Sequence, residues 1–360
     1  MTSGNGATAY DLDSKSLTGI LLVNLGTPEE PTAKGLRPYL GQFLGDRRVI
    51  DYPRWFWMPV LHGIILNVRP RRSAKLYASI WTDAGSPLLT ITQNLARKVQ
   101  DELLSDGQTD VKVVTAMRYG NPSIRAGLEE MRQANVRRIL VLPLFPQYSA
   151  TTTATIFDDV FDELKQWRWV PELRTVTAYH DHPLYIQGLA DSIKAHWAEH
   201  GRSQRLLYSF HGIPLSYEAK GDPYREYCLQ SARLVSDELG LEEDEYQLCF
   251  QSRFGPQEWL QPYTDKTLEA WAQDGSRNVD TLCPGFAVDC LETLEEMGVQ
   301  NKEIFLKAGG EGYEYISCLN DSEAQVRLMT ALVKQHTQGW ENNNQQSTEN
   351  RKQKTEDGRR

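Results

Sequence analysis

The chain repeats a pair of short motifs, and this repeat restricts its fold more than any other feature. VNLGTP at 23–28 is matched by SFHGIP at 209–214, and MRYGNP at 117–122 is matched by SRFGP at 252–256. Each motif ends an apolar run, and each second motif precedes a helical pattern and then a strand that ends in proline. Two similar four-stranded lobes, of about 160 and 140 residues, are the simplest account of this pattern.

Short runs rich in β-branched residues alternate with longer amphipathic segments, which predicts βα units and parallel sheets. Helical patterns lie between the runs, for example at 123–135, 183–200 and 265–275. Ligands of such sheets bind beyond the carboxyl ends of the strands, where the repeated motifs lie. The strands are expected at 17–26, 111–120, 137–146, 173–181, 205–214, 245–255, 277–286 and 303–309.

Composition limits the classes of partner. Hydrophobic residues make up 40% of the 360, which is enough for a substantial core. The net charge is -9, and no basic cluster is interleaved with aromatic residues, so nucleic acid is not an expected partner. The longest apolar stretch, at 55–66, contains Pro59 and is shorter than the roughly 20 residues that span a bilayer. We therefore expect no transmembrane segment and a cytoplasmic location.

The chain is expected to divide into five parts. A flexible tail at 1–16, which lacks the pattern of an export signal, precedes a first lobe at 17–181 and a second lobe at 182–321. An amphipathic helix at 322–338 should pack back on a lobe. The segment 339–360 is polar and has too few apolar residues to order itself, so it is predicted to be a disordered tail.

Five cysteines are an odd number and form no CxxC pair, which favours free thiols in a reducing compartment. They are Cys228, Cys249, Cys283, Cys290 and Cys318.

His211 is the first candidate for chemistry, because it stands where an apolar run ends. From position alone, a catalytic histidine and a satisfied core histidine are about equally frequent. Gly212 favours the catalytic interpretation, since glycine permits a sharp turn and the close approach of a ligand to the backbone.

A row of carboxylates is the second candidate. On a helix, Asp289, Glu292 and Glu296 would share one face, at i, i+3 and i+7. A solvated acidic helix start, which the helix dipole favours, is the simpler alternative. A histidine that faces such a row can instead hold a divalent transition metal and move protons.

The third candidate is the apolar insertion at about 52–81, which includes Trp55, Phe56 and Trp57. Such a segment either packs in the core or receives a flat apolar ligand. The arginines near its end, Arg69, Arg71 and Arg72, would suit carboxylates on that ligand.

Six motifs, in this order, resemble those of ferrochelatases, the enzymes that insert ferrous iron into a porphyrin. They are LLVNLGTPEEP, MRYGNP, PLFPQYSATTTAT, SFHGIPLSYEAKGDPY, FQSRFGPQEWLQPYTD and CPGFAVDCLETLEE, and the resemblance runs from Leu17 to Ser322. It implies an α/β fold of two Rossmann-like lobes, each a four-stranded parallel sheet flanked by helices, with the porphyrin in the cleft between them. The implied reaction is insertion of Fe²⁺ into protoporphyrin IX to form protohaem, the terminal step of haem biosynthesis.

The resemblance also implies roles for individual residues. His211 matches the active-site histidine of the family and Glu292 the facing glutamate, both implicated in metal binding and proton handling. Glu296 matches the next carboxylate of the same helix, and the insertion at 52–81 matches a lip over the macrocycle. The residues in motifs that line the porphyrin cleft are Leu25, Arg118, Tyr148, Ser149 and Trp259.

Two departures from the family pattern limit what can be transferred. Some members carry histidine where this chain has Cys290, so the role of that histidine does not carry over. The animal pattern places a cluster cysteine where Ala150 stands and others in a C-terminal extension, whereas this chain has no cysteine beyond Cys318. We therefore expect no [2Fe–2S] cluster and no cofactor beyond the substrate Fe²⁺.

Three alternatives remain open at this stage: a chelatase for coproporphyrin, a chelatase for sirohydrochlorin, and a porphyrin carrier without turnover. A carrier would not need a general base beside carboxylates. Peripheral contact with a membrane also remains possible on these residues.

Overall fold

Two four-stranded parallel sheets form the centre of the computed structural model, which describes residues 15–340. Their strand orders are β2-β1-β3-β4 and β6-β5-β7-β8, so the second sheet repeats the strand order of the first. The predicted two-sheet α/β fold is confirmed. The strands are β1 Leu17–Thr27, β2 Val111–Gly120, β3 Val136–Pro143, β4 Glu172–Thr175, β5 Arg205–His211, β6 Tyr246–Gln251, β7 Asn278–Leu282 and β8 Gly312–Ile316.

The eighth strand was predicted in the wrong place. Residues 303–309 lie mostly in helix α11, and the strand that pairs with β7 is β8, a few residues later. A short apolar run such as IFL does not distinguish a helix from a strand by its period. The ion pair between Glu303 and Lys307, four residues apart, is typical of a helix.

Helices connect the strands within each sheet. Hydroxyl side chains begin several of them: Ser123 accepts a hydrogen bond from the Ala126 N–H at the start of α5, and Ser322 caps α12 in the same way. The α-helices are α1 Ala33–Gly45, α2 Arg54–Val60, α3 Leu66–Ile80, α4 Pro87–Ser105, α5 Ile124–Gln133, α6 Thr155–Leu164, α7 Pro183–His200, α8 Leu215–Ala219, α9 Tyr224–Leu239, α10 Thr264–Gln273, α11 Lys302–Lys307 and α12 Glu323–His336. Three further segments are π-helical: η1 Leu61–Ile65, η2 Ala150–Ala154 and η3 Glu292–Asn301.

Both faces of each sheet are buried, and the side chains alternate accordingly. In β1, Ile20 and Leu22 join a core that includes α4, whereas Leu21 and Val23 pack against α5 and α6. In β5, Leu206 and Tyr208 face the same core as Ile20, and Leu207 faces α10 and α11. This double burial explains why the strands read as almost continuous apolar runs.

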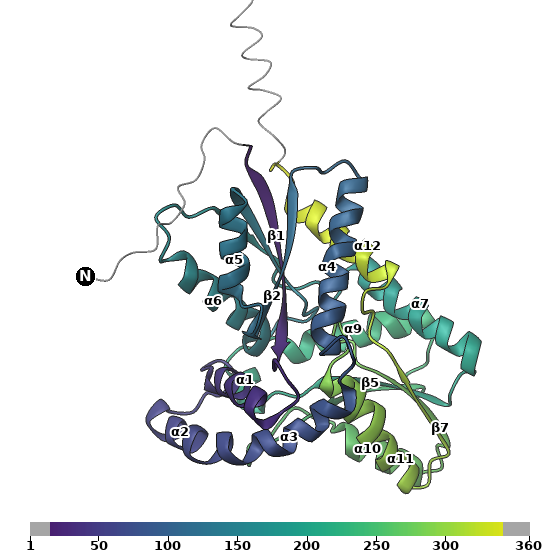
Figure 1. Ribbon diagram of the computed structural model, residues 1–360. Coiled ribbons are helices and arrows are strands. Elements are labelled where there is room, and N and C mark those ends of the chain that lie inside the picture. The colour runs from purple at the N-terminus through teal and green to yellow at the C-terminus, as the bar shows by residue number, and fades with distance from the viewer. Residues whose placement is uncertain (1–14, 341–360) are drawn as a thin grey trace, which may run out of the picture.

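Helix α12 packs against α4 of the first lobe and α7 of the second (yellow in Figure 1). Its side chains Leu328 and Leu332 belong to the core that both sheets share. Trp340, which the sequence assigns to the tail, is buried and donates its indole N–H to Glu172 of β4 at 2.5 Å. The ordered chain therefore extends past residue 339; the rest of the two predicted tails lies outside the described residues, apart from residues 15 and 16.

The apolar insertion forms a helical arm of α2, η1 and α3, and we call these residues, 54–80, the lip. Trp57 and Leu61 pack against α1, so part of the insertion is core. Trp55, Ile64 and Val68 are 81%, 60% and 68% exposed. The lip therefore buries one side and leaves an apolar surface on the other.

Candidate active site

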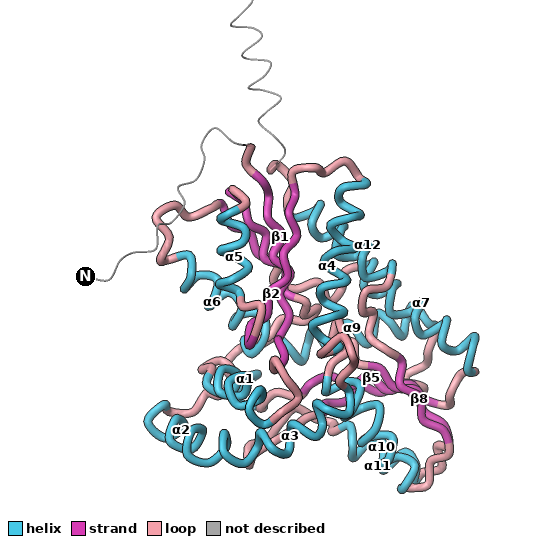
Figure 2. Tube along the Cα trace, in the orientation of Figure 1, coloured by secondary structure: helices cyan, strands magenta, loops and turns pink. Residues whose placement is uncertain are grey.

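One cavity of about 660 Å³ opens where the carboxyl ends of strands from both sheets meet the lip. Its size is within the range of small-molecule sites. Figure 2 shows the two sheets as separate groups of strands, one in each lobe. The lining includes Leu25, Phe43, Arg69, Arg72, Phe145, Gln147, Thr152, His211, Tyr217, Tyr224, Ser252, Arg253, Phe254, Trp259, Phe286, Glu292, Glu295, Glu296 and Gln300.

His211 is the last residue of β5 and lies half-buried in the cavity wall. Its Nδ1 is 2.7 Å from the carbonyl oxygen of Gly212. A carbonyl can only accept, so Nδ1 carries a hydrogen, and in the neutral ring the lone pair is therefore on Nε2. The imidazole is therefore held in the tautomer that can take up a proton at Nε2.

Gly212 allows a close backbone approach at this point. Its N–H donates to the carbonyl oxygen of Gln251 at 2.8 Å, which joins the ends of β5 and β6. A β-carbon on Gly212 would lie 3.0 Å from that oxygen and 3.2 Å from the ring of Trp259. A larger residue would crowd the Gln251 carbonyl and the Trp259 ring beside the cavity.

The carboxylates of the cavity come from η3, a π-helix whose hydrogen bonds join residues five apart. Glu292 and Glu296 both line the cavity, and Glu295 and Gln300 of the same helix line it too. Gln300 donates to Glu295 at 2.5 Å. π-Helical turns are rare and often occur at functional sites.

Asp289 does not belong to this row, so the prediction of a three-carboxylate face is wrong. It is buried before the helix begins and accepts hydrogen bonds from Tyr315 at 2.7 Å, Thr293 at 2.8 Å and Asn320 at 2.7 Å. These donors, together with the Cys318 N–H at 3.4 Å, satisfy its charge internally. Asp289 therefore ties the start of η3 to the segment after β8.

Glu296 is held by Ser252. The Ser252 N–H donates to its Oε1 at 2.9 Å, and the Ser252 hydroxyl donates to its Oε2. Burial raises the pKa of Glu296 above 4.5, although the serine hydrogen bonds and His211 act in the opposite direction. A carboxyl group with a raised pKa can hold or release a proton inside the cavity.

Cys290 lies beside Glu292 and is buried. Burial, and then the charge of Glu292, raise the pKa of the Cys290 thiol well above its usual value. The residue is therefore a neutral thiol, which cannot act as a base in the way a histidine at this position could.

The predicted cleft residues separate into two groups. Leu25 and Trp259 line the cavity, and the indole N–H of Trp259 donates to the Phe254 carbonyl at 3.0 Å. Arg118, Tyr148 and Ser149 are not in its lining. Tyr148 is half-buried, which raises the pKa of its hydroxyl, and Ser149 is buried and donates to Asp222 at 2.9 Å.

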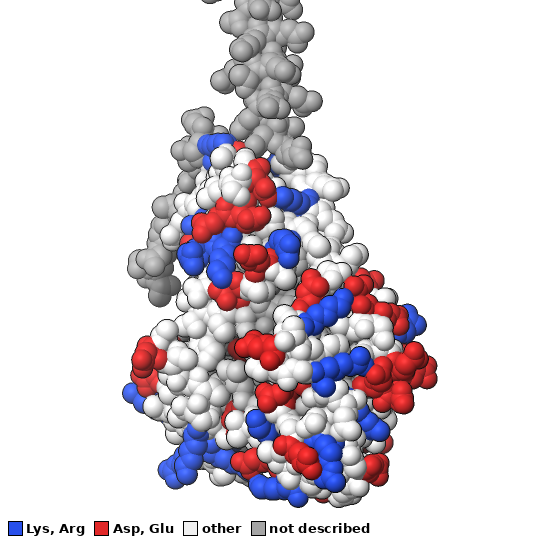
Figure 3. Space-filling model, turned by 90° about the vertical axis from the view of Figure 1, so that its right-hand side faces the viewer, with Lys and Arg blue, Asp and Glu red and all other residues white. Residues whose placement is uncertain are grey.

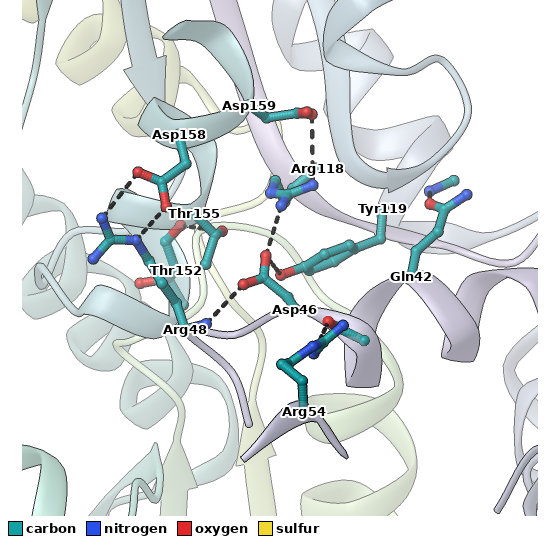
Figure 4. Close-up of polar contacts among 12 residues, drawn as sticks. Gln42, Asp46, Arg48, Arg54, Arg118, Tyr119, Thr152, Thr155, Asp158 and Asp159 are labelled. Carbon is teal, nitrogen blue, oxygen red and sulfur yellow. Dashed lines mark hydrogen bonds and ion pairs between the residues drawn. The ribbon is translucent and has the colours of Figure 1, made fainter. Parts of the chain in front are cut away.

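Arg118 forms ion pairs with two carboxylates (Figure 4). Its guanidinium donates to Asp46 at 2.6 Å and lies 3.5 Å from Asp159, and Tyr119 also donates to Asp46 at 3.0 Å. Arg48 pairs with Asp158 next to this group. These contacts fix the loop between α1 and the lip to the first lobe.

Several cavity residues were not found from the sequence, including Phe43, Tyr217, Tyr224, Ser252 and Glu295. Helical spacing could have predicted Glu295, because it lies three residues from Glu292. Ser252 begins one of the repeated motifs, which was a usable signal. Tyr217 and Tyr224 lie in the motif SFHGIPLSYEAKGDPY, but no periodic pattern marks them or Phe43 as cavity residues.

Two features are absent from the part of the chain that the structure describes. Among residues 15–340, no cluster of three or more His, Cys, Asp or Glu side chains could hold a metal ion. No helix in the same range is both long and apolar enough to cross a membrane. The face in Figure 3 carries acidic and basic side chains interspersed over the described residues, without a continuous basic band.

The fold is shared with solved chelatase structures. SirB from Bacillus subtilis with Fe³⁺ superposes with a TM-score of 0.52 at 12% identity, covering 90% of this chain and 97% of that one. The sirohydrochlorin chelatase SirB from Bacillus subtilis subspecies spizizenii, in complex with cobalt, gives 0.50 at 10% identity, covering 89% and 95%. The chain therefore has the two-lobed fold of these chelatases.

The chain belongs to the ferrochelatase family, whose model matches residues 17–337. The ferrochelatase of Nitrosococcus oceani is 52% identical over 335 residues, which cover 93% of this chain and 91% of that protein. The ferrochelatase of Vibrio cholerae is 52% identical over 316 residues, which cover 88% and 97%. The protein is thus a metal chelatase, a lyase.

The raised pKa of Glu296 leads to a prediction about stability. Because the folded state disfavours the ionised carboxyl, the stability from this group is complete below its unfolded pKa and is lost as pH rises through its folded pKa. Glu296→Gln does not titrate, so its Tm should exceed that of the wild type more at neutral pH than near pH 4.5. The measurement is thermal unfolding at both pH values.

Glu199→Gln is the matched control for this prediction, since the Glu199 side chain is 77% exposed and should affect Tm little at either pH. A Glu296→Gln protein whose Tm difference from the wild type is the same at both pH values would contradict the prediction.

Proposed function

We propose that the protein inserts Fe²⁺ into protoporphyrin IX to form protohaem, the terminal step of haem biosynthesis, with His211, Glu292 and Glu296 carrying the reaction. One observation supports this most: His211, Glu292 and Glu296 line a single cavity, and the lip forms a further wall of it. Metal insertion needs a proton acceptor and a metal carrier in the same space. This cavity contains both kinds of group.

The proposed proton path begins at the porphyrin. Insertion exchanges two pyrrole N–H protons for one Fe²⁺, so both protons must leave the ring. His211 accepts a pyrrole proton at Nε2 as a general base, because Nδ1 is engaged by the Gly212 carbonyl. Glu296, whose pKa is raised by burial, accepts the second pyrrole proton on η3, and before insertion the same carboxylate passes the metal to Glu292.

His211 and Glu292 are the proposed protein ligands of the incoming iron. Nε2 of His211 binds the metal first and takes up a pyrrole proton only after the metal has passed to the ring. An imidazole nitrogen and a carboxylate oxygen suit a first-row divalent metal. Two protein ligands hold the ion loosely, and the four pyrrole nitrogens complete the transfer to the ring. Strain that bends the macrocycle would present these nitrogens to the metal, offset by apolar contacts at the cavity wall.

The cations of the cavity favour protoporphyrin over coproporphyrin. Each propionate needs a cation partner, and protoporphyrin has two propionates whereas coproporphyrin has four. Among the described cavity residues the arginines are Arg69, Arg72 and Arg253, and Arg253 already forms a bidentate pair with Asp265 at 2.6 and 2.8 Å. Two arginines remain for propionates, which matches protoporphyrin.

Anaerobic incubation tests the proposed function. Fe²⁺ is added with protoporphyrin, coproporphyrin or sirohydrochlorin in separate reactions, and the visible spectrum is followed. Conversion of protoporphyrin at the highest kcat/KM is expected. A higher kcat/KM with coproporphyrin or sirohydrochlorin would show that this tetrapyrrole is the substrate. Binding without conversion would indicate a carrier.

His211→Ala should abolish insertion and leave porphyrin binding largely intact, because the imidazole acts on protons and metal. A general base usually contributes 10²–10⁴-fold, so turnover should fall by at least about a hundredfold. Turnover and porphyrin fluorescence quenching are measured on the same preparation. His200→Ala, at an exposed position at the end of α7, is the control. More than about a tenth of wild-type turnover in His211→Ala would contradict the role.

The protein should contain no iron–sulfur cluster. Such a cluster ordinarily takes four protein ligands, usually cysteines, and the five cysteines here are buried free thiols. Acid-labile sulfide and visible absorbance are measured after anaerobic purification, and both should be at background. Stoichiometric sulfide would show that a cluster is bound.

A cytoplasmic location and peripheral membrane contact complete the proposal. The free thiols favour a reducing compartment. The lip exposes the apolar side chains Trp55, Phe56 and Ile64, which lie outside the cavity lining and are of the kind that inserts shallowly into a bilayer interface.

Lipid vesicles test this contact by co-sedimentation. The wild type should sediment with them, and Trp55→Ser combined with Ile64→Ser should reduce the bound fraction several-fold. Wild-type protein that stays in the supernatant with both neutral and anionic vesicles would exclude contact by this surface.

A further inference from the structure

Ser252, the first residue after β6, has an unusual backbone conformation in the cavity wall. Its φ is 66°, in the left-handed region that a residue with a β-carbon rarely adopts. Within residues 15–340, the other non-glycine residues with positive φ are Asn135 and Asn320, and asparagine tolerates this region better than most residues do. A strained backbone persists where the surrounding structure requires it, which often occurs at functional sites.

The conformation directs two donors of one residue to one carboxylate. The Ser252 N–H donates to Oε1 of Glu296 at 2.9 Å, and its hydroxyl donates to Oε2. Both oxygens of Glu296 are thus engaged, which fixes the plane of the carboxylate. The hydroxyl can donate to a carboxylate or accept from a carboxylic acid, so this contact persists in either state.

The preceding residue connects the same corner to the rest of the site. The Gln251 side-chain amide donates to the Glu292 carbonyl at 2.9 Å, and its Oε1 accepts from the Ser209 hydroxyl at 2.6 Å. Its backbone carbonyl accepts from the N–H of Gly212, next to His211. Gln251, at the end of β6, therefore fixes the start of η3 and the end of β5 relative to each other.

The first lobe provides an internal comparison, because SRFGP repeats MRYGNP. Arg253 corresponds to Arg118, and both arginines are engaged by aspartates. Ser252 corresponds to Met117, a fully buried apolar residue. The hydroxyl is therefore found in the copy of the motif that faces the carboxylates.

We propose that Ser252 is a positioning residue for iron delivery, which orients the Glu296 carboxylate toward the cavity so that it can pass the metal to Glu292. It acts through Glu296 and has no contact with the reacting atoms. The inference rests on the proposed function and adds a residue to it.

Two substitutions separate the hydroxyl from the backbone strain. Ser252→Ala removes the hydroxyl and keeps the strain, whereas Ser252→Gly removes the hydroxyl and relieves the strain. Both should raise the KM for iron about tenfold or more at saturating porphyrin, since a hydrogen bond to a charged group is lost. The KM for porphyrin and porphyrin fluorescence quenching should not change.

Ser236→Ala is the matched control. Ser236 is a fully buried serine of the same lobe whose hydroxyl pairs with Tyr208 at 3.0 Å and has no contact with the cavity. Its loss should lower stability and leave the KM for iron unchanged. A normal KM for iron in Ser252→Gly, in a folded protein, would overturn the proposal.

A double-mutant cycle with Glu296→Gln decides whether Ser252 acts through that carboxylate. Glu296→Gln alone should raise the KM for iron, and adding Ser252→Ala should change it no further. Additive effects, or a raised KM for porphyrin instead of iron, would overturn the proposal, since Ser252 would then act on another group. If the wild type inserts iron and the Ser252 variants have an unchanged KM for iron, only the role of Ser252 is contradicted. If the wild type inserts no iron, the proposed function is contradicted as well.

Discussion

The apolar core between the two sheets determines where the cavity lies. Ile20 and Leu142 of the first sheet meet Tyr208 and Phe210 of the second in one continuous cluster, which α4, α7 and α12 complete. Because both sheets are parallel, all their carboxyl ends can open into one space once this core sets the angle between them. The two lobes are therefore not independent units, and a change in this core would alter the spacing of the cavity walls.

The second lobe carries the groups with proposed chemical roles, and the first lobe and the lip complete the enclosure. His211 is fixed by its own strand end, and Glu292 and Glu296 are fixed by a π-helix that packs beside it. The repeat thus provides two similar frameworks, of which one acquired reactive side chains. The copy in the first lobe has its arginine, Arg118, in ion pairs that fasten the loop before the lip.

Much of the fold could be predicted because local patterns specify it. Seven of the eight strands lie within the expected ranges or overlap them, since fully buried parallel strands are apolar along their whole length. The segment around Phe305 was misassigned because a short apolar run fits a helix and a strand equally well. The prediction for Asp289 was wrong because its partners, Tyr315 and Asn320, are distant in sequence. Likewise, nothing near Arg118 in the sequence indicates its pairing with Asp46.

The central claim is that His211 and Glu292 act on a porphyrin held in the cavity between the sheets. A crystal structure of the protein with protoporphyrin bound tests it most directly. The account predicts a macrocycle inside the cavity, with its pyrrole nitrogens within reach of His211 Nε2 and the Glu292 carboxylate. A macrocycle bound on the outer surface of the lip, or with its nitrogens turned away from both residues, would contradict it.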